Sequence, residues 1–170
     1  MTATLPVITE RQSPHYDDRP QAETVSLLVI HNISLPAAEF SKVPQHSYID
    51  ALFMGELDCT AHPSFAGLAG VRVSAHCVIW RDGSIFQYVP FAKRAWHAGV
   101  SSFAGRERCN DFSIGIELEG TDNLPYTDQQ YKSLINLTLM IMQRYPAITP
   151  ERIAGHCDIA PGRKTDPGTA

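Results

Sequence analysis

The sequence predicts an α/β fold: a single domain with a mixed central β-sheet that includes a hairpin and is flanked by helices. Three observations predict it, namely an apolar run at residues 25–31, a strand that turns back on itself within residues 73–89, and a helical pattern between residues 127 and 146. A chain of 170 residues suits one domain and is too short for two full ones. We therefore expect residues 1–170 to form one domain.

The first half of the chain predicts one strand and a long excursion. Residues 1–23 are rich in proline and polar groups, which predicts an irregular lead-in. The run VSLLVIH at residues 25–31 is apolar on both faces, as expected of a central strand that ends at His31. A proline-bearing excursion follows, with one short helix near residues 48–57. Long excursions of this kind usually border functional sites.

A hairpin and a further strand follow the excursion. VSAHCVIW at residues 73–80 predicts a strand, and an Asp-Gly turn folds the chain back into SIFQYV at residues 84–89. Residues 112–120 alternate with a period of two. Glu117 and Glu119 therefore lie on the same face of that strand.

The clearest predicted helix begins after Thr127. Thr127 and Gln130 have the spacing of a capping box, in which each side chain accepts a hydrogen bond from the backbone N–H of the other residue. Apolar residues then recur at helical spacing until Pro146 ends the pattern. We expect this helix to pack against the sheet.

Composition and charge exclude several classes of function. The net charge is −4 and no stretch is basic enough to follow a phosphate backbone, which argues against nucleic acid. No apolar run approaches the roughly 20 residues of a membrane span, and the first twenty residues lack the core of an export signal. We expect a cytoplasmic protein without an obligate protein partner. Its four cysteines are then expected to be reduced thiols, at Cys59, Cys77, Cys109 and Cys157.

Reactive side chains gather in the C-terminal stretch at residues 155–168. His156, Lys164 and Asp166 occur there among glycines and prolines, which predicts a loop. His31 ends the first strand, so two imidazoles and a carboxylate can meet at one edge of the sheet. Such a set suits zinc with one position open for water, as in catalytic sites. The spacing alone is weak evidence, because a His-x9-Asp pattern also recurs by chance.

Several sequence blocks resemble a known family. These are HNISLP at 31–36, VSAHC at 73–77, RAWHAGVSSF at 94–103, GRERCNDFSIGIELEGTD at 105–122 and GHCDIAPGRKTDPG at 155–168. In order and content, they resemble the zinc-dependent N-acetylmuramoyl-L-alanine amidases. The resemblance is closest to members that act on anhydromuropeptides in peptidoglycan recycling. It implies hydrolysis of the amide between the lactyl group of 1,6-anhydro-N-acetylmuramic acid and L-alanine of the stem peptide.

The resemblance also implies residue roles. His31, His156 and Asp166 are the implied zinc ligands, Glu117 handles the proton of the attacking water, and Lys164 stabilises the oxyanion. These roles agree with general chemistry, because zinc acidifies a bound water and polarises the scissile carbonyl. A carboxylate can take the water proton and deliver it to the leaving amine. A fixed positive charge offsets charge that develops on the tetrahedral oxygen.

Five further residues are candidates for substrate binding. Trp96 and His97 lie in a glycine-containing segment after the hairpin and are expected to line a sugar or peptide pocket. Asn32, beside His31, and the guanidinium groups of Arg72 and Arg108 suit the amide and carboxylate groups of an acidic peptide. The alternative for both arginines is a solvated surface.

Each assignment has a structural alternative. His31 and His156 can be hydrogen-bonded histidines at strand ends, and Asp166 before a proline is also common turn chemistry. His76, inside a predicted buried strand, is more often a core histidine than a ligand. Glu119 is expected to be peripheral or structural, because a zinc mechanism does not need a second acid.

Two other functions compete with the amidase hypothesis. The first is a peptidoglycan-binding module that kept the fold and lost turnover, which a missing zinc ligand would favour. The second is a thiol hydrolase that uses Cys157 or Cys77. We disfavour it because Cys157 and His156 are adjacent, and neighbours in an extended segment point to opposite faces.

One departure from the family pattern concerns the C-terminus. Related chains continue past KTDPG into an aromatic-bearing segment, whereas this sequence ends at Ala170. The expectation is a looser support for Lys164 and Asp166, with a cost in metal affinity or stability.

Overall fold

A six-stranded mixed β-sheet forms the centre of the computed structural model, which describes residues 5–169. Four neighbouring strands run parallel to one another. The fifth pairs antiparallel with the outermost of these four to form the predicted hairpin, and the sixth, at the edge, runs parallel to the fifth. The mixed sheet confirms the predicted α/β class. From edge to edge the strands are β1 (Ile8–Glu10), β5 (Ile85–Gln87), β4 (Cys77–Ile79), β9 (Ser113–Glu119), β3 (Leu27–Ile33) and β10 (Ile153–Gly155).

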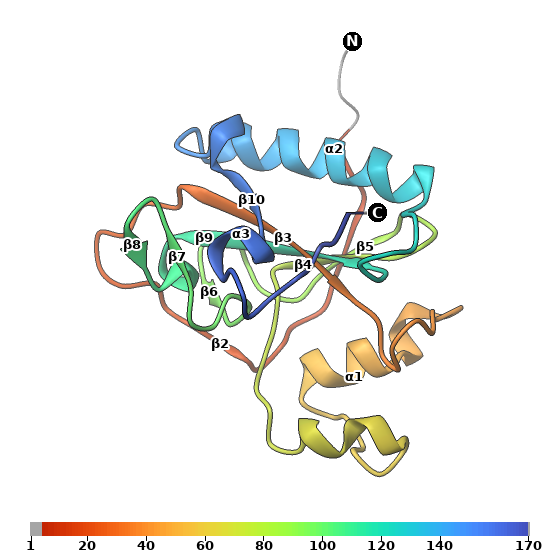
Figure 1. Cartoon of the computed structure of the whole chain (residues 1–170). Helices are drawn as coiled ribbons and strands as arrows, with labels where there is room; N and C mark the ends of the chain where they lie inside the picture. The colour runs from red at the N-terminus through yellow and green to blue at the C-terminus, as the bar shows by residue number, and fades with distance from the viewer. Residues whose placement is uncertain (1–4, 170) are drawn as a thin grey trace.

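Helices cover both faces of this sheet (Figure 1). α2 (Asp128–Arg144) lies along one face, and α1 (Tyr48–Met54) lies on the opposite side. The single turn α3 (His156–Ile159) follows β10 directly. The shorter strands form two ribbons, β2 (Tyr16–Asp17) with β6 (Arg94–Ala95) and β7 (Ser102–Phe103) with β8 (Arg106–Glu107). The 3-10 turns are η1 (Pro44–His46), η2 (Pro63–Leu68), η3 (Cys109–Asp111) and η4 (Pro150–Arg152).

Side-chain alternation along β9 separates the two faces of the sheet, as the sequence predicts. Ile114 and Ile116 belong to the same buried cluster as Leu137 of α2. The intervening residues of β9 therefore face away from α2, toward the side that carries α1. Glu117 belongs to this second set and pairs in register with His31 of β3.

The capping box of α2 is confirmed. Thr127 Oγ1 accepts the N–H of Gln130, and Gln130 Oε1 accepts the N–H of Thr127. These bonds satisfy amides that a helix N-terminus otherwise leaves unpaired. The apolar positions are not all turned inward, because Tyr131 and Ile135 are 43% and 58% exposed.

α1 confirms the predicted short helix. Ser47 Oγ caps it by accepting the N–H of Asp50, and Gly55 ends it in the left-handed conformation with φ of 74°. The buried carboxylate of Asp50 accepts hydrogen bonds from Arg11 at 2.6 Å and from Tyr88 at 2.7 Å. This network ties α1 to the sheet and to the N-terminal segment.

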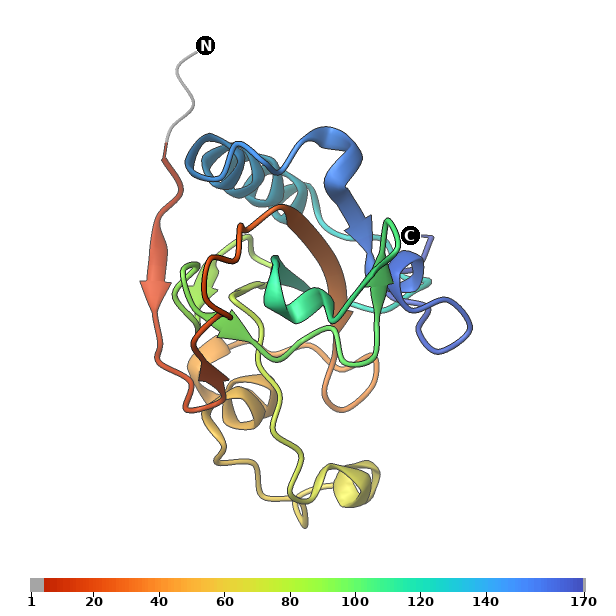
Figure 2. The same cartoon turned by 90° about the vertical axis from the view of Figure 1, so that its left-hand side faces the viewer.

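The irregular lead-in predicted for residues 1–23 contains two short strands in its described part. That segment forms β1 at the edge of the sheet, drawn in red in Figure 2, and then β2. Its order comes from long-range hydrogen bonds: the Arg11 N–H donates to the carbonyl of Gln87, and the Arg19 guanidinium donates to the carbonyl of Phe91. Edge pairing of this kind needs no apolar alternation, so periodicity does not reveal it.

Two predicted strand boundaries also need correction. β3 continues to Ile33, two residues beyond His31. The strand predicted for residues 73–80 is shorter in the structure, where β4 covers only Cys77–Ile79. The residues before β4 hydrogen-bond to a different segment: the Ser74 N–H donates to the carbonyl of Trp96.

Candidate active site

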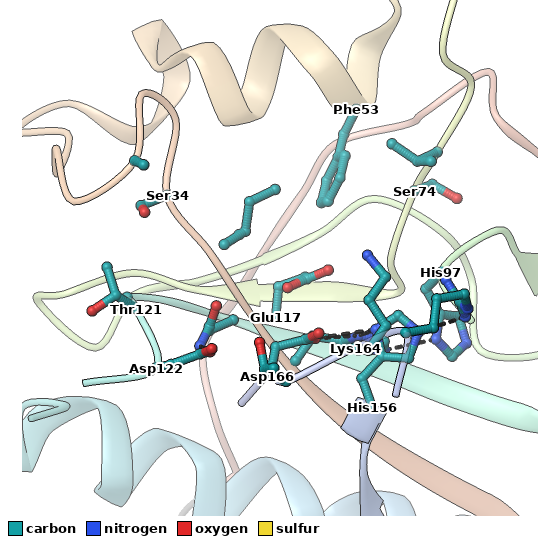
Figure 3. A pocket seen from close by; sticks show the side chains of 18 of the residues that line it. Ser34, Phe53, Ser74, His97, Glu117, Thr121, Asp122, His156, Lys164 and Asp166 are labelled. Carbon is teal, nitrogen blue, oxygen red and sulfur yellow. Dashed lines mark hydrogen bonds and ion pairs between the residues drawn. The ribbon is translucent and has the colours of Figure 1, made fainter. Parts of the chain in front are cut away.

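A cavity of about 700 Å³ lies at the carboxyl ends of β3, β9 and β10 (Figure 3). Ligand sites in open α/β sheets typically lie at these strand ends. Although the chain separates these residues widely, the fold gathers all five implied ligands and catalytic groups around this cavity: His31, Glu117, His156, Lys164 and Asp166.

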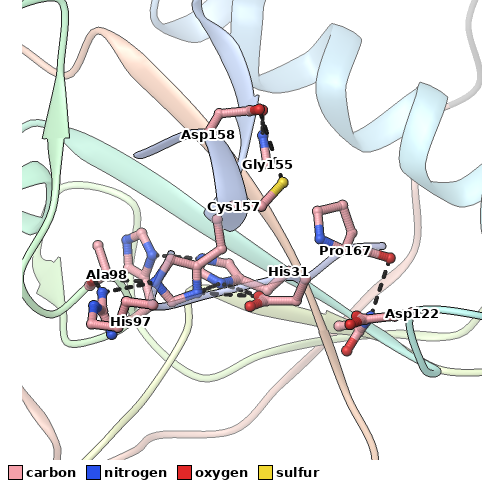
Figure 4. A network of polar contacts seen from close by, with 12 residues as sticks. His31, His97, Ala98, Asp122, Gly155, Cys157, Asp158 and Pro167 are labelled. Atoms are coloured by element: carbon pink, nitrogen blue, oxygen red, sulfur yellow. Dashed lines mark hydrogen bonds and ion pairs between the residues drawn. The ribbon is translucent and has the colours of Figure 1, made fainter. Parts of the chain in front are cut away.

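Three side-chain atoms converge in the lining of the cavity, from His156 and Asp166, labelled in Figure 3, and from His31, labelled in Figure 4. His31 Nδ1 lies 3.0 Å from His156 Nδ1, and Asp166 Oδ2 lies 3.1 Å from each of these nitrogens. Ligands that bind one zinc ion at about 2 Å lie close to such separations. The three atoms can therefore share a single cation.

Backbone pairing positions these side chains. The register of β3 and β9 places His31 opposite Glu117. β10 lies beside β3, and His156 starts α3 immediately after β10 ends. The predicted loop therefore begins with a helical turn, which corrects the sequence prediction. It then returns to the site, where the Cys157 N–H donates to the carbonyl of Asp166 at 2.9 Å.

Burial and mutual contact set the charges of the ligand set. Burial lowers the pKa of His31 to about 4, although the hydrogen bond with Asp166 opposes this shift. Burial raises the pKa of Asp166, but its hydrogen bonds with His156 and His31 outweigh that effect and leave the pKa below its ordinary value. A neutral imidazole and an ionised carboxylate are the forms that bind metals.

The residues present fit a zinc ion. Two imidazole nitrogens and one carboxylate oxygen form a ligand set that leaves a fourth position open, as in catalytic zinc sites. Glu117 provides a second sign of fit, because its buried Oε2 has no hydrogen-bond partner among residues 5–169. Buried polar atoms are normally paired, so an unpaired one at a cavity indicates a missing partner such as substrate or water.

Glu117 and Lys164 both line this cavity, and Figure 3 shows their side chains near each other. Burial raises the pKa of Glu117 well above its ordinary value; the charge of Asp166 acts in the same direction and that of Lys164 opposes it. Lys164 itself is exposed, in the loop between α3 and Asp166. A carboxyl with a raised pKa beside a fixed positive charge suits proton transfer.

Arg163 also lines the cavity and was not predicted from the sequence. Its Nη2 donates to the carbonyls of Ala98 and Val100, both at 2.7 Å. The sequence contains one signal for Arg163, because this residue stands next to Lys164 in the block at residues 155–168 that also contains His156 and Asp166. Asp122 is a second lining residue that the sequence analysis missed.

Of the predicted substrate-binding residues, three line the cavity. Trp96 does so while its Nε1 donates to Asp17 at 3.2 Å. Asn32 does so while its Nδ2 donates to Asp122 Oδ1 and to the carbonyl of Pro167. His97 is the third, and both of its ring nitrogens have partners inside the protein.

Arg72 and Arg108 lie elsewhere. Arg72 is exposed and lines a separate hollow with His15. Arg108 is exposed, pairs with Asp111 at 3.3 Å, and lines a neighbouring groove of about 480 Å³ that also includes Arg163. Both arginines are therefore outside the lining of the main cavity.

The structural alternatives hold for His76 and Glu119. His76 is buried, and its Nδ1 accepts the N–H of Gly115 at 3.0 Å. The buried Glu119 carboxylate accepts the backbone N–H groups of Ser41 at 2.7 Å and Arg81 at 3.2 Å. Neither residue contributes to the ligand set.

The cysteines do not form a nucleophilic site. All four are free thiols, and Cys77 is fully buried. Burial and then the charge of Asp158 raise the pKa of Cys157, so its thiol stays protonated. Cys157 lies on a helical turn rather than in the extended segment that the sequence predicted. Reactive cysteines instead have lowered pKa values.

The terminal loop is well anchored around Asp166. Tyr126 OH donates to the carbonyl of Pro167 at 2.7 Å, beside the bond from Asn32 to the same oxygen. The Thr169 N–H donates to the carbonyl of Asp122. These hydrogen bonds hold Pro167 and Thr169 in place, and the expected cost in metal affinity or stability stays a prediction.

Comparison with known proteins now identifies the family. The family model described as "N-acetylmuramoyl-L-alanine amidase" matches residues 21–169. The chain belongs to this family. It is 66% identical over 156 residues to the 1,6-anhydro-N-acetylmuramyl-L-alanine amidase AmpD of Citrobacter freundii, which covers 92% of this chain and 81% of that protein.

Solved structures of the family agree with the fold. A crystal structure of a selenomethionine AmpD derivative superposes with a TM-score of 0.90 at 63% identity, covering 98% of this chain and 90% of that one. A complex of the Escherichia coli amidase AmiD with the substrate anhydro-N-acetylmuramic acid-L-Ala-D-gamma-Glu-L-Lys has a TM-score of 0.61 at 33% identity. That match covers 88% of this chain and 56% of the other.

None of the helices within residues 5–169 combines the length and apolar character needed to cross a lipid bilayer. The longest, α2, has 17 residues.

Proposed function

We propose that this protein is a zinc-dependent amidase that hydrolyses the bond between the lactyl group of 1,6-anhydro-N-acetylmuramic acid and L-alanine of the stem peptide, in peptidoglycan recycling. The observation that carries the proposal is the convergence of His31, His156 and Asp166 to within 3.1 Å, beside a buried glutamate with an unpaired oxygen. The AmpD relatives and the AmiD complex support the choice of substrate.

His31 Nδ1, His156 Nδ1 and Asp166 Oδ2 would hold the zinc ion. When bound, zinc supplies a Lewis acid that lowers the pKa of water and polarises a carbonyl, so no covalent nucleophile is needed. The chain's contribution is to hold the three ligands on one side and to leave the cavity side open.

Glu117 is the proton carrier in this proposal. Its unpaired Oε2 faces no protein donor among the described residues, so it is available to accept a proton from the attacking water. Its raised pKa favours holding that proton and then passing it to the leaving amine nitrogen. One carboxylate therefore serves both transfers.

Lys164 and the cavity walls complete the site. The exposed ammonium of Lys164 lies at the cavity, where it offsets the negative charge that develops on the former carbonyl oxygen. Trp96 contributes an apolar ring to the lining of the cavity, and Asn32 and Thr121 contribute polar side chains. A cavity of this size and mixed lining suits a sugar joined to a short peptide.

Metal removal tests the proposal. Incubate the protein with a chelator, remove the chelator, and measure release of free peptide from a defined anhydromuropeptide by mass spectrometry. We expect turnover to disappear and to return when about one zinc per chain is restored. Turnover that is indifferent to metal removal would contradict zinc catalysis. Parallel substrates with anhydro and reducing sugar ends test the specificity.

The second candidate is a non-catalytic module that binds the same cell-wall fragments. The complete ligand set and the unpaired Glu117 oxygen favour catalysis over this alternative. A protein that carries one zinc, binds the fragment and yet releases no peptide would instead support the binding module.

The proposal includes the cellular setting. We infer that residues 1–170 act as one amidase domain in the cytoplasm, without nucleic acid, membrane or an obligate protein partner. The four free thiols support a reducing compartment.

A further inference from the structure

The ring nitrogens that point away from the metal site have well-defined partners. His31 Nε2 lies 2.8 Å from His97 Nδ1, with the two rings nearly perpendicular at 88°. His156 Nε2 lies 3.2 Å from the carbonyl oxygen of Ala98 and 3.4 Å from Nη2 of Arg163, which itself donates to that same carbonyl at 2.7 Å. Two consecutive residues thus contact the outer nitrogens of both ligating histidines.

The chemistry of neutral imidazole fixes the direction of these bonds. A neutral imidazole has one N–H, and the nitrogen that binds a metal cannot carry it. Because Nδ1 of His31 and Nδ1 of His156 face the shared site, each Nε2 carries the hydrogen and donates outward. Ala98 accepts through its carbonyl, and His97 accepts through its unprotonated Nδ1.

The proton of His97 is then assigned to its other nitrogen. With Nδ1 accepting from His31, the single N–H of His97 is at Nε2, which lies 3.1 Å from Ser113 Oγ. The chain of donors therefore runs from His31 through His97 to Ser113. His97 therefore has no ring nitrogen left for a substrate.

The residues around His97 and Ala98 hold this segment in place. Asn110 Oδ1 accepts the backbone N–H of His97 at 3.1 Å and that of Ala98 at 2.8 Å. Position 115 must be glycine for the ring to fit, because a Cβ there would lie 2.5 Å from the His97 ring. Both features fix the segment independently of any substrate.

We propose that His97, together with the Ala98 carbonyl, is a positioning element that holds both zinc-ligating histidines with Nδ1 turned to the metal. This inference deepens the proposed function, since it rests on His31 and His156 binding zinc. His97 touches neither the metal nor the substrate in this role, so it is a positioning residue. Partners of this kind orient ligands and raise their basicity, and their loss typically costs about 10-fold to 100-fold in metal affinity.

Zinc affinity provides the first test. Measure the zinc dissociation constant of the full-length protein by competition with a chromophoric chelator, for wild type, His97→Ala and His97→Asn. We expect His97→Ala to bind zinc about 10-fold to 100-fold more weakly. His97→Asn should recover most of this loss, because its side-chain oxygen can accept at the position of Nδ1. The matched control is His46→Asn, at an exposed histidine of η1 that does not line the cavity, which should bind zinc as wild type does.

The possible outcomes distinguish a failure of the positioning role of His97 from a failure of the proposed zinc-dependent function. Wild type that binds no zinc would overturn the proposed function itself. Wild type that binds zinc while His97→Ala binds equally well would overturn only the positioning role. Equal losses in His97→Ala and His97→Asn would also overturn it, because they would point to lost packing rather than a lost acceptor.

A spectroscopic measurement on wild type avoids any problem of folding in the variants. Long-range proton–nitrogen NMR of the zinc-loaded protein reports which nitrogen of each histidine carries hydrogen. We expect His97 to be neutral and protonated at Nε2, with its resonances assigned by their absence in His97→Asn. A His97 that is protonated at Nδ1 would overturn the inference.

Discussion

Two buried glutamates on β9 lie two residues apart on one face, yet their surroundings differ. Glu119 accepts backbone N–H groups from Ser41 and Arg81, and so holds the excursion and the hairpin against the strand. Glu117 lines the cavity with an oxygen that has no partner within residues 5–169. Burial raises the pKa of both carboxyls.

The difference shows that burial and a shifted pKa do not by themselves identify a catalytic acid. What distinguishes Glu117 is unmet hydrogen-bonding capacity at a cavity, beside a metal-binding set and a lysine. Glu119 has its hydrogen bonds satisfied by the chain, so it contributes to structure. Function follows from the site around a residue rather than from the residue type.

The largest expected effect is the loss of turnover in Glu117→Gln. The amide cannot accept and return the proton of water, so kcat should fall by about two to four powers of ten. Zinc content should stay near one per chain, because Glu117 is not a ligand. Steady-state kinetics with metal analysis checks both; unchanged turnover would remove Glu117 from the mechanism.

Lys164→Ala should have the next largest effect. Removing a charge that acts on the developing oxyanion should lower kcat by about 10²-fold to 10³-fold, with a smaller change in KM. Full kinetic profiles on a defined anhydromuropeptide separate the two constants. A change confined to KM would make Lys164 a substrate-binding residue instead.

Glu119→Gln should affect stability more than catalysis. One carboxylate oxygen would be replaced by an amide NH₂ facing a backbone N–H, which should lower the free energy of unfolding by about 1 to 3 kcal/mol. Turnover of the folded protein should stay near wild type. Urea titration and kinetics on the same sample check this; a loss of turnover equal to that of Glu117→Gln would erase the distinction between the two residues.

The smallest expected effect is a change in how stability depends on pH. Glu117 ionises near 4.5 when unfolded and at higher pH when folded. Between these pH values the metal-free folded state holds a proton that the unfolded state has lost, so its unfolding free energy falls as pH rises. Glu117→Gln should remove this decline, by at most about 1.4 kcal/mol per pH unit.

Urea titrations of both metal-free proteins from pH 4.5 to 8 measure this difference. The lowered pKa of His31 has the opposite effect, because it makes the unfolding free energy rise with pH below 6.5, the ordinary pKa of histidine. Subtracting the unfolding free energy of the variant from that of wild type cancels this contribution. A difference that stays flat, or that grows in favour of wild type with pH, would show that the pKa of Glu117 is not raised in the folded state.

Local patterns predicted much of the fold from the sequence. Alternation predicted β9 and that Glu117 and Glu119 share one of its faces, and the spacing of Thr127 and Gln130 predicted the start of α2. The convergence of His31 with His156 did not follow from periodicity, because it depends on the parallel pairing of β3 and β10. There the family resemblance supplied what local patterns could not.

The unpredicted features rest on contacts that residue type does not encode. The edge strand β1 is held by backbone pairing, and the Ala98 carbonyl that contacts His156 could belong to any residue. The exposed positions of Arg72 and Arg108 likewise depend on where the loops turn. Such contacts emerge only once the chain is folded.

The face of β9 that points away from α2 carries residues with four different tasks, and this limits how the length of the strand can change. On this face, Ser113 ends the chain of donors and Gly115 leaves room for the imidazole of His97. Glu117 lines the cavity, and Glu119 anchors the excursion through its hydrogen bond with Ser41. Inserting or deleting a single residue within this strand would turn every one of these side chains beyond the change to the opposite face and put an apolar neighbour in its place. The strand therefore cannot change its length without losing part of the site.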